Sequence, residues 1–286
     1  MMQNDQNATE NSRGSEVAGK VLLALGALLL AAGIAAGCSI PLLLLGAAVS
    51  GGGGALRSHA RKALRQQVND TVVPDVLQTI FLQPRFEPSR RLRGDLIAAS
   101  GLPLPRYTDC TGGEYVCGVY RGMEVELSSI TLLESYEIQN EESNQWETRE
   151  NVVYAGQWLV CRTGAAQPVD LMLAPRGKLD RIFRTKRMET GDEAFDKRFN
   201  VSADEDTAAR RFLTQDRMER LIALADAAGG GLSVRLLRDG TLYLAVQSGH
   251  SFFDIGKGRE SAELLRQRFT EELRCYTKLI DLFCPA

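Results

Sequence analysis

The sequence predicts an α+β protein that is attached to a membrane by an N-terminal transmembrane helical hairpin. Three patterns lead to this prediction. A long N-terminal run carries no charge, apolar and polar residues alternate in short runs through the middle of the chain, and apolar residues recur at helical spacing near its end. The boundaries we assign are a disordered tail at 1–16, the transmembrane hairpin at 17–56, a juxtamembrane helix and linker at 57–105, and a cytosolic α+β domain at 106–286.

The uncharged run from Val21 to Leu56 has 36 residues. A single upright transmembrane helix needs about 20 apolar residues to cross the hydrocarbon core. Gly37 to Pro41 supply a turn within the run, because glycine and proline interrupt helices. These lengths favour two short helices at 17–37 and 40–56. A single span at 21–45 with a glycine-rich exit is the alternative.

The charges that flank this run predict its orientation. Arg57, Arg61, Lys62 and Arg65 follow it directly, and no acid occurs before Asp70. Basic residues beside a span are retained in the cytoplasm. We therefore expect a multi-pass protein of the bacterial inner membrane, with its C-terminal domain in the cytoplasm.

Ala35 to Cys38 allow a competing interpretation, because they loosely resemble a bacterial lipobox. Residues 21–37 would then be a cleaved signal, Cys38 would carry the lipid, and the folded domain would lie outside the cytoplasm. Three acids in the preceding segment weigh against this interpretation, as does an alanine at the position where leucine is usual.

The next segment is expected to be helical and then to become a linker. Val72, Val76 and Ile80 recur at helical spacing, and Pro74 is expected to kink or restart the helix. From Pro84 to Pro105 no periodicity continues. We therefore expect a linker there, with several arginines close to the membrane.

Alternation predicts antiparallel strands from Tyr107 onward. Residues 115–120 and 123–127 form a hairpin around Arg121 and Gly122. The acidic stretch at 134–150 lacks periodicity and is expected to be an exposed loop or a strand extension. Two more strands are predicted at 152–162 and 169–174.

The last third of the chain alternates helices and strands. Phe199 begins a short strand, and Thr214 is the expected N-cap of a helix that ends at three glycines, 229–231. A hairpin follows, with its turn at Asp239 and Gly240. The amphipathic helix from Ser261 to Phe283 then completes the domain.

Several short motifs resemble a bacterial family that is catalogued only as a domain of unknown function. The motifs are Phe195-Asp196-Lys197-Arg198-Phe199-Asn200-Val201, then Ala209-Arg210, Leu213-Thr214 and Met218. Asp196 stands where the family pattern has glutamate. Members usually begin with two membrane spans, so the resemblance implies a membrane-anchored architecture. It implies no chemistry.

Composition excludes several classes of function. The 34 basic and 36 acidic side chains nearly balance, at a formal charge of −2, which argues against a nucleic-acid partner. The chain has two histidines, His59 and His250, and no Cys-x-x-Cys pair, so we expect no metal site. The glycines at 51–54 lack the Gly-Lys-Ser/Thr of a phosphate loop. We expect no cofactor.

The function we expect is a non-enzymatic, membrane-anchored binding or scaffold module. Its partners would be the lipid bilayer and a membrane or cytosolic protein, because basic side chains near an anionic surface each contribute about 1 kcal/mol of attraction. The lipid-facing candidates are Arg57, Arg61, Lys62, Arg65, Arg85, Arg90, Arg91, Arg93, Arg181, Arg184, Lys186 and Arg187.

The alternatives are an extracytoplasmic lipoprotein domain and a membrane-bound enzyme. The enzyme would assemble its site from scattered residues, with Asp109, Glu124, Glu126 and His250 as candidates. A deep polar pocket that gathers these four side chains would favour the enzyme, whereas a shallow basic face would favour the binding module.

Overall fold

A computed structural model describes residues 58, 61–139, 145–177, 185–258 and 260–284. The chain divides into two compact units. The first consists of residues Met1–Val76 and Ile255–Arg268, and the second of Leu77–Asp254 and Phe269–Ala286. The expected transmembrane hairpin at 17–56 lies outside the described residues. Within the described residues, no helix combines the length and the apolar character needed to cross a bilayer.

The described part of the first unit is mainly helical. Residues 61–67 are α-helical, a π-helical turn η1 (Val68–Val72) follows, and α3 (Val73–Ile80) continues from it into the second unit. Pro74 cannot donate a backbone hydrogen bond, so the helix widens in the turn before it instead of breaking. The expected irregularity at Pro74 is therefore a π-turn.

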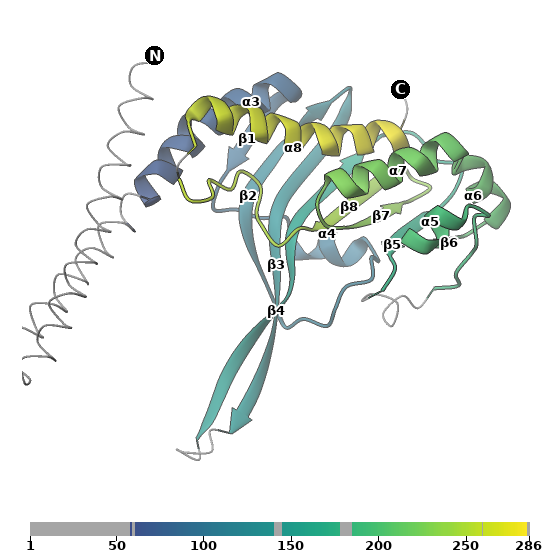
Figure 1. Ribbon diagram of the computed structural model, residues 1–286, viewed down its shortest axis with the longest axis horizontal. Helices are drawn as coiled ribbons and strands as arrows, with labels where there is room; N and C mark the ends of the chain where they lie inside the picture. The colour runs from purple at the N-terminus through teal and green to yellow at the C-terminus, as the bar shows by residue number, and fades with distance from the viewer. Residues whose placement is uncertain (1–57, 59–60, 140–144, 178–184, 259, 285–286) are drawn as a thin grey trace, which may run out of the picture. The chain divides into compact units, whose positions relative to one another are not determined.

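The second unit is built on one eight-stranded sheet (Figure 1). The strand order is β1-β2-β3-β4-β8-β7-β5-β6, and every neighbouring pair is antiparallel, which confirms the expected antiparallel α+β class. The strands are β1 (Leu82–Glu87), β2 (Asp109–Tyr120), β3 (Met123–Gln139), β4 (Trp146–Arg162), β5 (Leu171–Pro175), β6 (Phe199–Ala203), β7 (Gly231–Leu236) and β8 (Thr241–Gln247).

The turn between β2 and β3 lies where the sequence predicts it. Tyr120 pairs with Met123, and the two residues between them, Arg121 and Gly122, have φ angles of 51° and 83°. Positive φ at both central positions matches the twist of the flanking strands. The β7–β8 hairpin is also confirmed, with Leu236 paired to Leu242 around the turn that contains Gly240.

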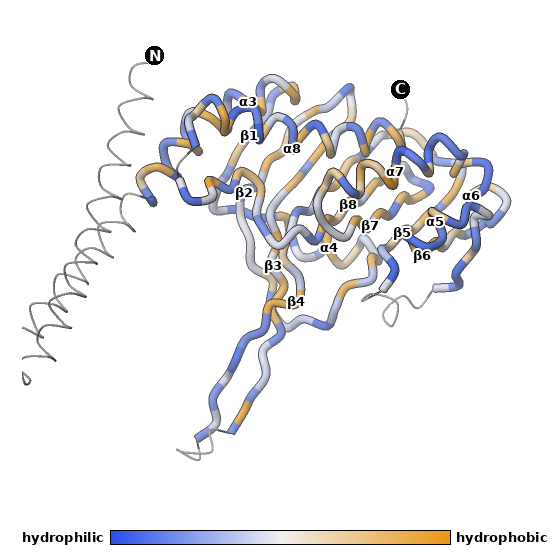
Figure 2. The backbone as a smooth tube through the Cα atoms, in the orientation of Figure 1, coloured by the Kyte–Doolittle hydropathy of each residue, from blue (hydrophilic) through white to orange (hydrophobic). Residues whose placement is uncertain are grey.

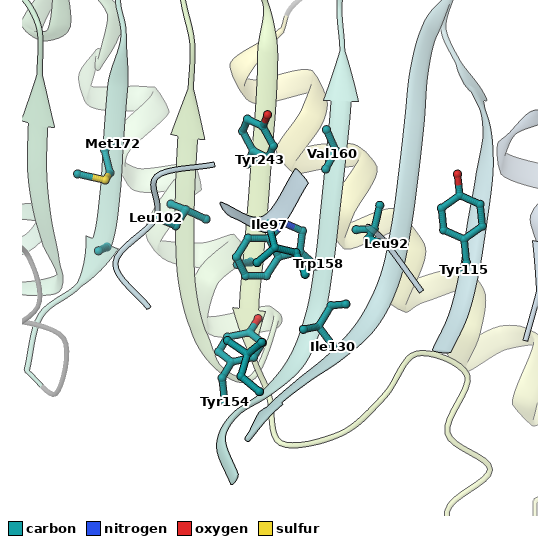
Figure 3. Packing of buried hydrophobic residues seen from close by; sticks show 13 residues of the cluster. Leu92, Ile97, Leu102, Tyr115, Ile130, Tyr154, Trp158, Val160, Met172 and Tyr243 are labelled. Atoms are coloured by element: carbon teal, nitrogen blue, oxygen red, sulfur yellow. The ribbon is translucent and has the colours of Figure 1, made fainter. Parts of the chain in front are cut away.

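The sheet is covered on both faces, as neighbouring residues of β4 show. Trp158 lies on the face that packs against Ile97 of α4 (Gly94–Ala99) (Figure 3). Gln157 points to the other face, where Tyr276 of α8 (Ala262–Phe283) bonds to it. Successive side chains of a strand point to opposite faces of the sheet. Because both faces are covered here, this part of β4 has a nearly continuous apolar sequence. The central strands are accordingly among the most hydrophobic parts of the chain (Figure 2).

Three further helices follow β5 along the chain. α5 (Glu193–Arg198) is capped by Asp192, whose side chain accepts from the amide of Phe195 over 2.8 Å. α6 (Asp206–Phe212) leads into α7 (Gln215–Ala227). The predicted N-cap of α7 is confirmed, because Thr214 Oγ1 accepts from the amide of Arg217 over 3.3 Å.

The segment expected to be a linker is part of the fold. Residues 84–105 include most of β1 and all of α4, and they bury Leu92, Ile97 and Leu102. Pro84 is tolerated because β1 is an edge strand, where one side of the strand needs no partner. The sequence does not predict this strand and helix, because their apolar residues lie singly between prolines and arginines and show no periodicity.

The described part of the acidic stretch is a strand extension. Beyond the sheet, residues 133–139 of β3 pair with residues 146–152 of β4, from Leu133 opposite Val152 to Gln139 opposite Trp146. We call these two segments the arm, and Figure 1 shows them projecting from the sheet. The arm is largely hydrophilic (Figure 2).

Candidate functional site

Two adjoining pockets lie where several strands of the second unit end. One has a volume of about 500 Å³ and the other about 420 Å³, and both are lined by Pro175, Arg176 and Gly231. The pairing of β4, β8, β7, β5 and β6 brings these strand ends to one edge of the sheet. We call the two pockets together the basic groove, because its charged side chains are Arg176, Lys197, Arg198 and Asp226.

The cations of the basic groove come from two segments that a backbone hydrogen bond joins. The amide of Arg176, just after β5, donates to the carbonyl of Arg198 at the end of α5 over 3.0 Å. Arg198 also forms an ion pair with Asp226. Lys197 pairs with Glu193 one turn earlier, at 2.6 Å between two highly exposed side chains. Ion pairs between exposed side chains are weak.

Arg176 differs from its two neighbours. Its side chain is exposed, and it has no ion-pair or hydrogen-bond partner among the described residues. It lines both pockets, whereas Lys197 and Arg198 line only the smaller one. The groove therefore carries one unpaired cation at its centre and two loosely paired cations on one side.

Three glycines form one wall of the basic groove. They end α7, as predicted, and Gly229 adopts a φ of 67° that favours glycine at a helix C-terminus. A Cβ at Gly230 would collide with the backbone carbonyl of Gln247. Glycine therefore lets the loop after α7 approach the end of β8 closely, which shapes the groove.

The larger pocket has an apolar wall at the base of the arm. Val152, Val153, Tyr154 and Ala155 line it, and Val152 is 56% exposed. An exposed valine beside a cation suits a ligand that has both an apolar and an anionic part. The larger pocket thus combines one cation, Arg176, with an apolar wall.

The predicted basic candidates lie elsewhere and mostly have partners. Arg90 donates to Glu87 over 2.7 Å and stacks over the ring of Tyr115 at 4.3 Å from its centroid. Arg93 pairs with Asp95, and Arg91 donates to the carbonyl of Leu92 over 2.9 Å. Arg85 is exposed on β1. These four arginines thus share one segment but not one ligand site.

The remaining candidates are dispersed or undescribed. Arg61, Lys62 and Arg65 lie on the helix of the first unit, where Arg61 donates to the carbonyl of Gly256 over 2.9 Å. Lys186 lies 3.5 Å from Asp206, and Arg187 is exposed beside it. Three candidates fall outside the described residues: Arg57, Arg181 and Arg184.

The structure does not gather the four residues of the proposed enzyme site. Asp109 pairs with Leu133 at one end of β2, whereas Glu124 pairs with Arg162 near the other end of that part of the sheet. Glu126 accepts hydrogen bonds from Tyr115 and Arg162, each at 2.7 Å. His250 lies on the loop after β8, and the described residues hold no group of three side chains suited to a metal ion.

His250 belongs to a polar cluster around the buried side chain of Gln157. Gln157 Nε2 donates to the carbonyl of His250 over 3.0 Å, and Gln157 Oε1 accepts from the hydroxyls of Ser248 (2.7 Å) and Tyr276 (3.3 Å). Gln157 and Tyr276 are buried, so the bond between them satisfies two polar groups that are removed from water, whereas Ser248 and His250 are partly exposed. The cluster therefore anchors the loop after β8 to the sheet.

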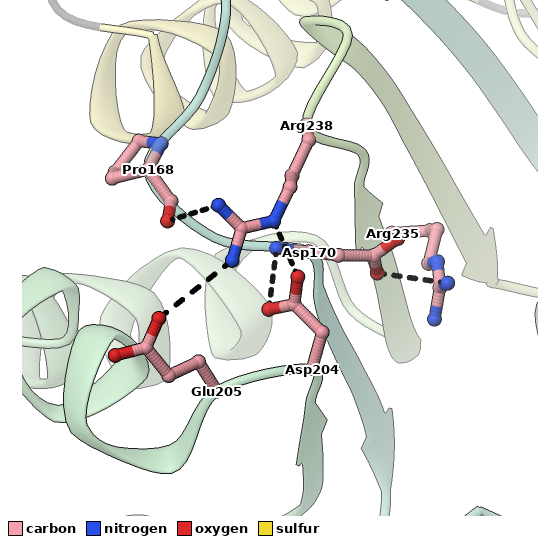
Figure 4. A network of polar contacts seen from close by, with 6 residues as sticks. All are labelled: Pro168, Asp170, Asp204, Glu205, Arg235 and Arg238. Atoms are coloured by element: carbon pink, nitrogen blue, oxygen red, sulfur yellow. Dashed lines mark hydrogen bonds and ion pairs between the residues drawn. The ribbon is translucent and has the colours of Figure 1, made fainter.

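A second cluster ties together the loops near β5, β6 and β7 (Figure 4). Arg238 bonds to the carboxylate of Asp204 and to the carbonyl of Pro168, the latter over 3.0 Å. Asp204 also accepts from the amide of Asp170 over 3.1 Å. Each charged side chain of this cluster has an oppositely charged neighbour, so the cluster ties these loops together.

In the sequence, Arg176 begins a basic stretch at 176–187, whereas Lys197 and Arg198 belong to the motif at 195–201, and no local pattern predicts that they lie together. The motif itself contains a signal. Phe195, Phe199 and Val201 are buried, so core packing explains them, whereas Lys197 is exposed and packing does not explain it. Lys197 and Arg198 are the exposed charged residues of the motif, and both line the basic groove.

A comparison with family models matches the C-terminal part of the chain. Residues 153–284 match the family model described as "Protein of unknown function (DUF3137)". The resemblance to a family catalogued only as a domain of unknown function is thereby confirmed for these residues. No curated protein matches this chain.

One solved structure is similar to this chain. It is the crystal structure of the mycobacterial trehalose monomycolate transport factor A, TtfA, with 13% sequence identity and a TM-score of 0.42. The match covers 77% of this chain and 97% of that chain.

Proposed function

We propose that this protein is a membrane-anchored binding module whose basic groove holds the anionic head of an amphiphilic ligand. The ligand class is a phosphate-bearing or carboxylate-bearing lipid. The observation that carries the proposal is the unpaired side chain of Arg176 at the junction of a cationic pocket and an apolar pocket. A guanidinium matches the geometry of phosphate and carboxylate groups, because it offers several donors in one plane.

The groove favours binding over catalysis. Its charged groups are three cations and one carboxylate, and the described residues that line it include no histidine, cysteine or pair of acids suited to proton transfer. The proposed enzyme residues are instead dispersed or held in ion pairs. The site is thus the shallow basic face that the sequence associates with a binding module.

The membrane part of the proposal rests on the sequence. Residues 21–56 carry no charge, and Arg57, Arg61, Lys62 and Arg65 follow them. We place the protein in the bacterial inner membrane as a multi-pass protein with the domain that carries the basic groove in the cytoplasm. Reporter fusions at both termini test this placement. A C-terminal reporter that is active only outside the cytoplasm would contradict it and would favour a lipoprotein processed at Cys38.

Ligand binding is testable with the full-length chain in nanodiscs. Discs of phosphatidylglycerol supply anionic heads, and discs of phosphatidylcholine supply zwitterionic heads. We expect slower hydrogen exchange of residues 226–232 and 247–249 in the anionic discs. The double variant R176A/K197A is expected to lose this protection, because each cation contributes about 1 kcal/mol near an anionic surface. Equal exchange in both discs would overturn the proposal.

Two controls separate the possible causes. Arg211→Ala removes an exposed arginine of α6 that has no partner among the described residues, and it should leave the protection unchanged. Glycerol phosphate, added to the zwitterionic discs, tests the source of the anionic group. If it reproduces the full protection, the ligand is a soluble phosphate ester and the lipid part of the proposal is wrong.

A further inference from the structure

The arm has no neighbouring strand on either of its two edges in the described part of the chain. On one side, the pairing of β2 with β3 ends at Asp109, opposite Leu133. The amide of Ser135 donates a hydrogen bond to the hydroxyl of Thr108 over 2.8 Å, so the edge of β3 is open only beyond Ser135. On the other side, β8 pairs only with residues 157–162 of β4. The longer open edge is therefore residues 146–152 of β4.

An isolated ribbon of this kind is poorly stabilised. Two-stranded hairpins are only marginally stable in water, and an open strand edge readily pairs with another chain. The arm also exposes large apolar side chains, since Trp146 is 68% exposed and Tyr136 is 47% exposed. Trp146 lies at the free end of the open β4 edge, opposite Gln139.

The charges of the arm restrict what can pair with it. Its described residues include the acids Glu134, Glu137, Glu147 and Glu150, against the single base Arg149. Like charges on adjacent strands repel, so the arms of two copies of this chain do not suit each other. Positive charge on the partner would be attracted instead.

We propose that the arm is a docking surface for an extended, basic segment of a partner protein. The segment adds to the open edge of β4 as a strand, through backbone hydrogen bonds to residues 146–152. Its lysine or arginine side chains lie against Glu137 and Glu150, which share one face of the arm with Trp146, and one of them stacks on the Trp146 ring. The arm precedes the family match at 153–284, so the partner is expected to be particular to chains that carry an arm.

Synthetic peptides test the proposal on the full-length chain. The probe is a peptide that alternates arginine with valine, and the two comparison peptides are its glutamate counterpart and an arginine peptide with methylated backbone amides. Trp146 serves as the reporter, because the other tryptophan, Trp158, is completely buried. We expect the arginine peptide to shift Trp146 emission to shorter wavelength and to slow hydrogen exchange at residues 146–152.

Variants locate the binding and exclude unspecific attraction. E137K/E150K should weaken binding about ten-fold, because it reverses two exposed charges on the face of the arm that carries Trp146. Glu219→Lys, an exposed acid of α7, is the matched control and should leave binding unchanged. Equal binding of the methylated peptide would overturn strand addition. Absence of binding, or equal protection of acidic segments outside the arm, would overturn the docking surface.

Discussion

The backbone amide of Arg176 donates a hydrogen bond to the carbonyl of Arg198 over 3.0 Å. This bond joins the end of β5 to the end of α5 and holds two arginines on the rim of one groove. The Arg198 side chain is paired with Asp226, while the Arg176 side chain has no partner among the described residues. In the basic groove, the guanidinium of Arg176 is therefore unpaired, and that of Arg198 is paired with one carboxylate.

Removing the competing carboxylate should strengthen ligand binding. Asp226→Asn releases Arg198 from its ion pair, and we expect it to raise affinity for phosphatidylglycerol about two- to five-fold. The free energy of unfolding should change by less than about 1 kcal/mol, because the pair is exposed. Titration of the full-length chain with short-chain phosphatidylglycerol measures the affinity. Unchanged or weaker binding would show that Arg198 does not contact the ligand.

The exposed and buried residues of the family motif should behave differently. Phe195→Ala removes a completely buried ring that packs on Phe199 at 5.0 Å between centroids, and it should cost about 3–5 kcal/mol of unfolding free energy. Lys197→Ala should cost less than about 0.5 kcal/mol and reduce ligand affinity. Urea unfolding provides the comparison. A large loss of stability in Lys197→Ala would assign the lysine to folding.

Gln157 is expected to stabilise the loop after β8. Gln157→Leu removes the partner of the buried Tyr276 hydroxyl and one bond each from Ser248 and His250, so we expect a loss of about 1–3 kcal/mol. Hydrogen exchange at residues 249–252 should quicken. Gln247→Leu, which changes an exposed glutamine of β8, is the control. Similar losses in both variants would contradict the anchoring role.

Glu126 predicts a loss of stability in acid. Burial alone would raise the pKa of this carboxyl, but hydrogen bonds from Tyr115 and Arg162 outweigh burial and hold the pKa below its ordinary value of 4.5. A lowered pKa stabilises the fold above 4.5, and the contribution disappears as the pH falls through the folded-state value.

The variant Glu126→Gln isolates this contribution. The wild-type chain should lose more unfolding free energy than the variant between neutral pH and a pH well below 4.5. Urea unfolding at the two pH values measures the difference. Equal losses in the two proteins would show that the hydrogen bonds do not favour the charged form of Glu126.

Local patterns predict the elements that local forces determine. The hairpin at Arg121 and Gly122, the cap at Thr214 and the final helix follow from alternation, turn chemistry and helical spacing. The strand β1 and the helix α4 do not, because prolines and arginines separate their apolar residues and the sheet alone makes them part of the core. The sequence predicts the arm only as an exposed loop or a strand extension, because its acidic side chains interrupt the alternation of apolar and polar residues.

The basic groove could not be predicted from the sequence. Arg176 and Arg198 are far apart along the chain, and the wall between them comes from the glycines after α7. Only the strand order β7-β5-β6 brings these segments to one edge. The basic runs that the sequence does display, at 85–93 and near 186, are mostly paired with nearby acids and backbone carbonyls.

Photo-crosslinking tests the central proposal most directly. The full-length chain in nanodiscs is exposed to a phosphatidylglycerol analogue with a photoactivatable group near its head, and the crosslinked peptides are mapped by mass spectrometry. The proposal predicts crosslinks to the peptides that contain Arg176, Lys197 and residues 229–231, with loss of these crosslinks in R176A/K197A. Crosslinks that avoid these peptides, or that persist unchanged in the double variant, would contradict it.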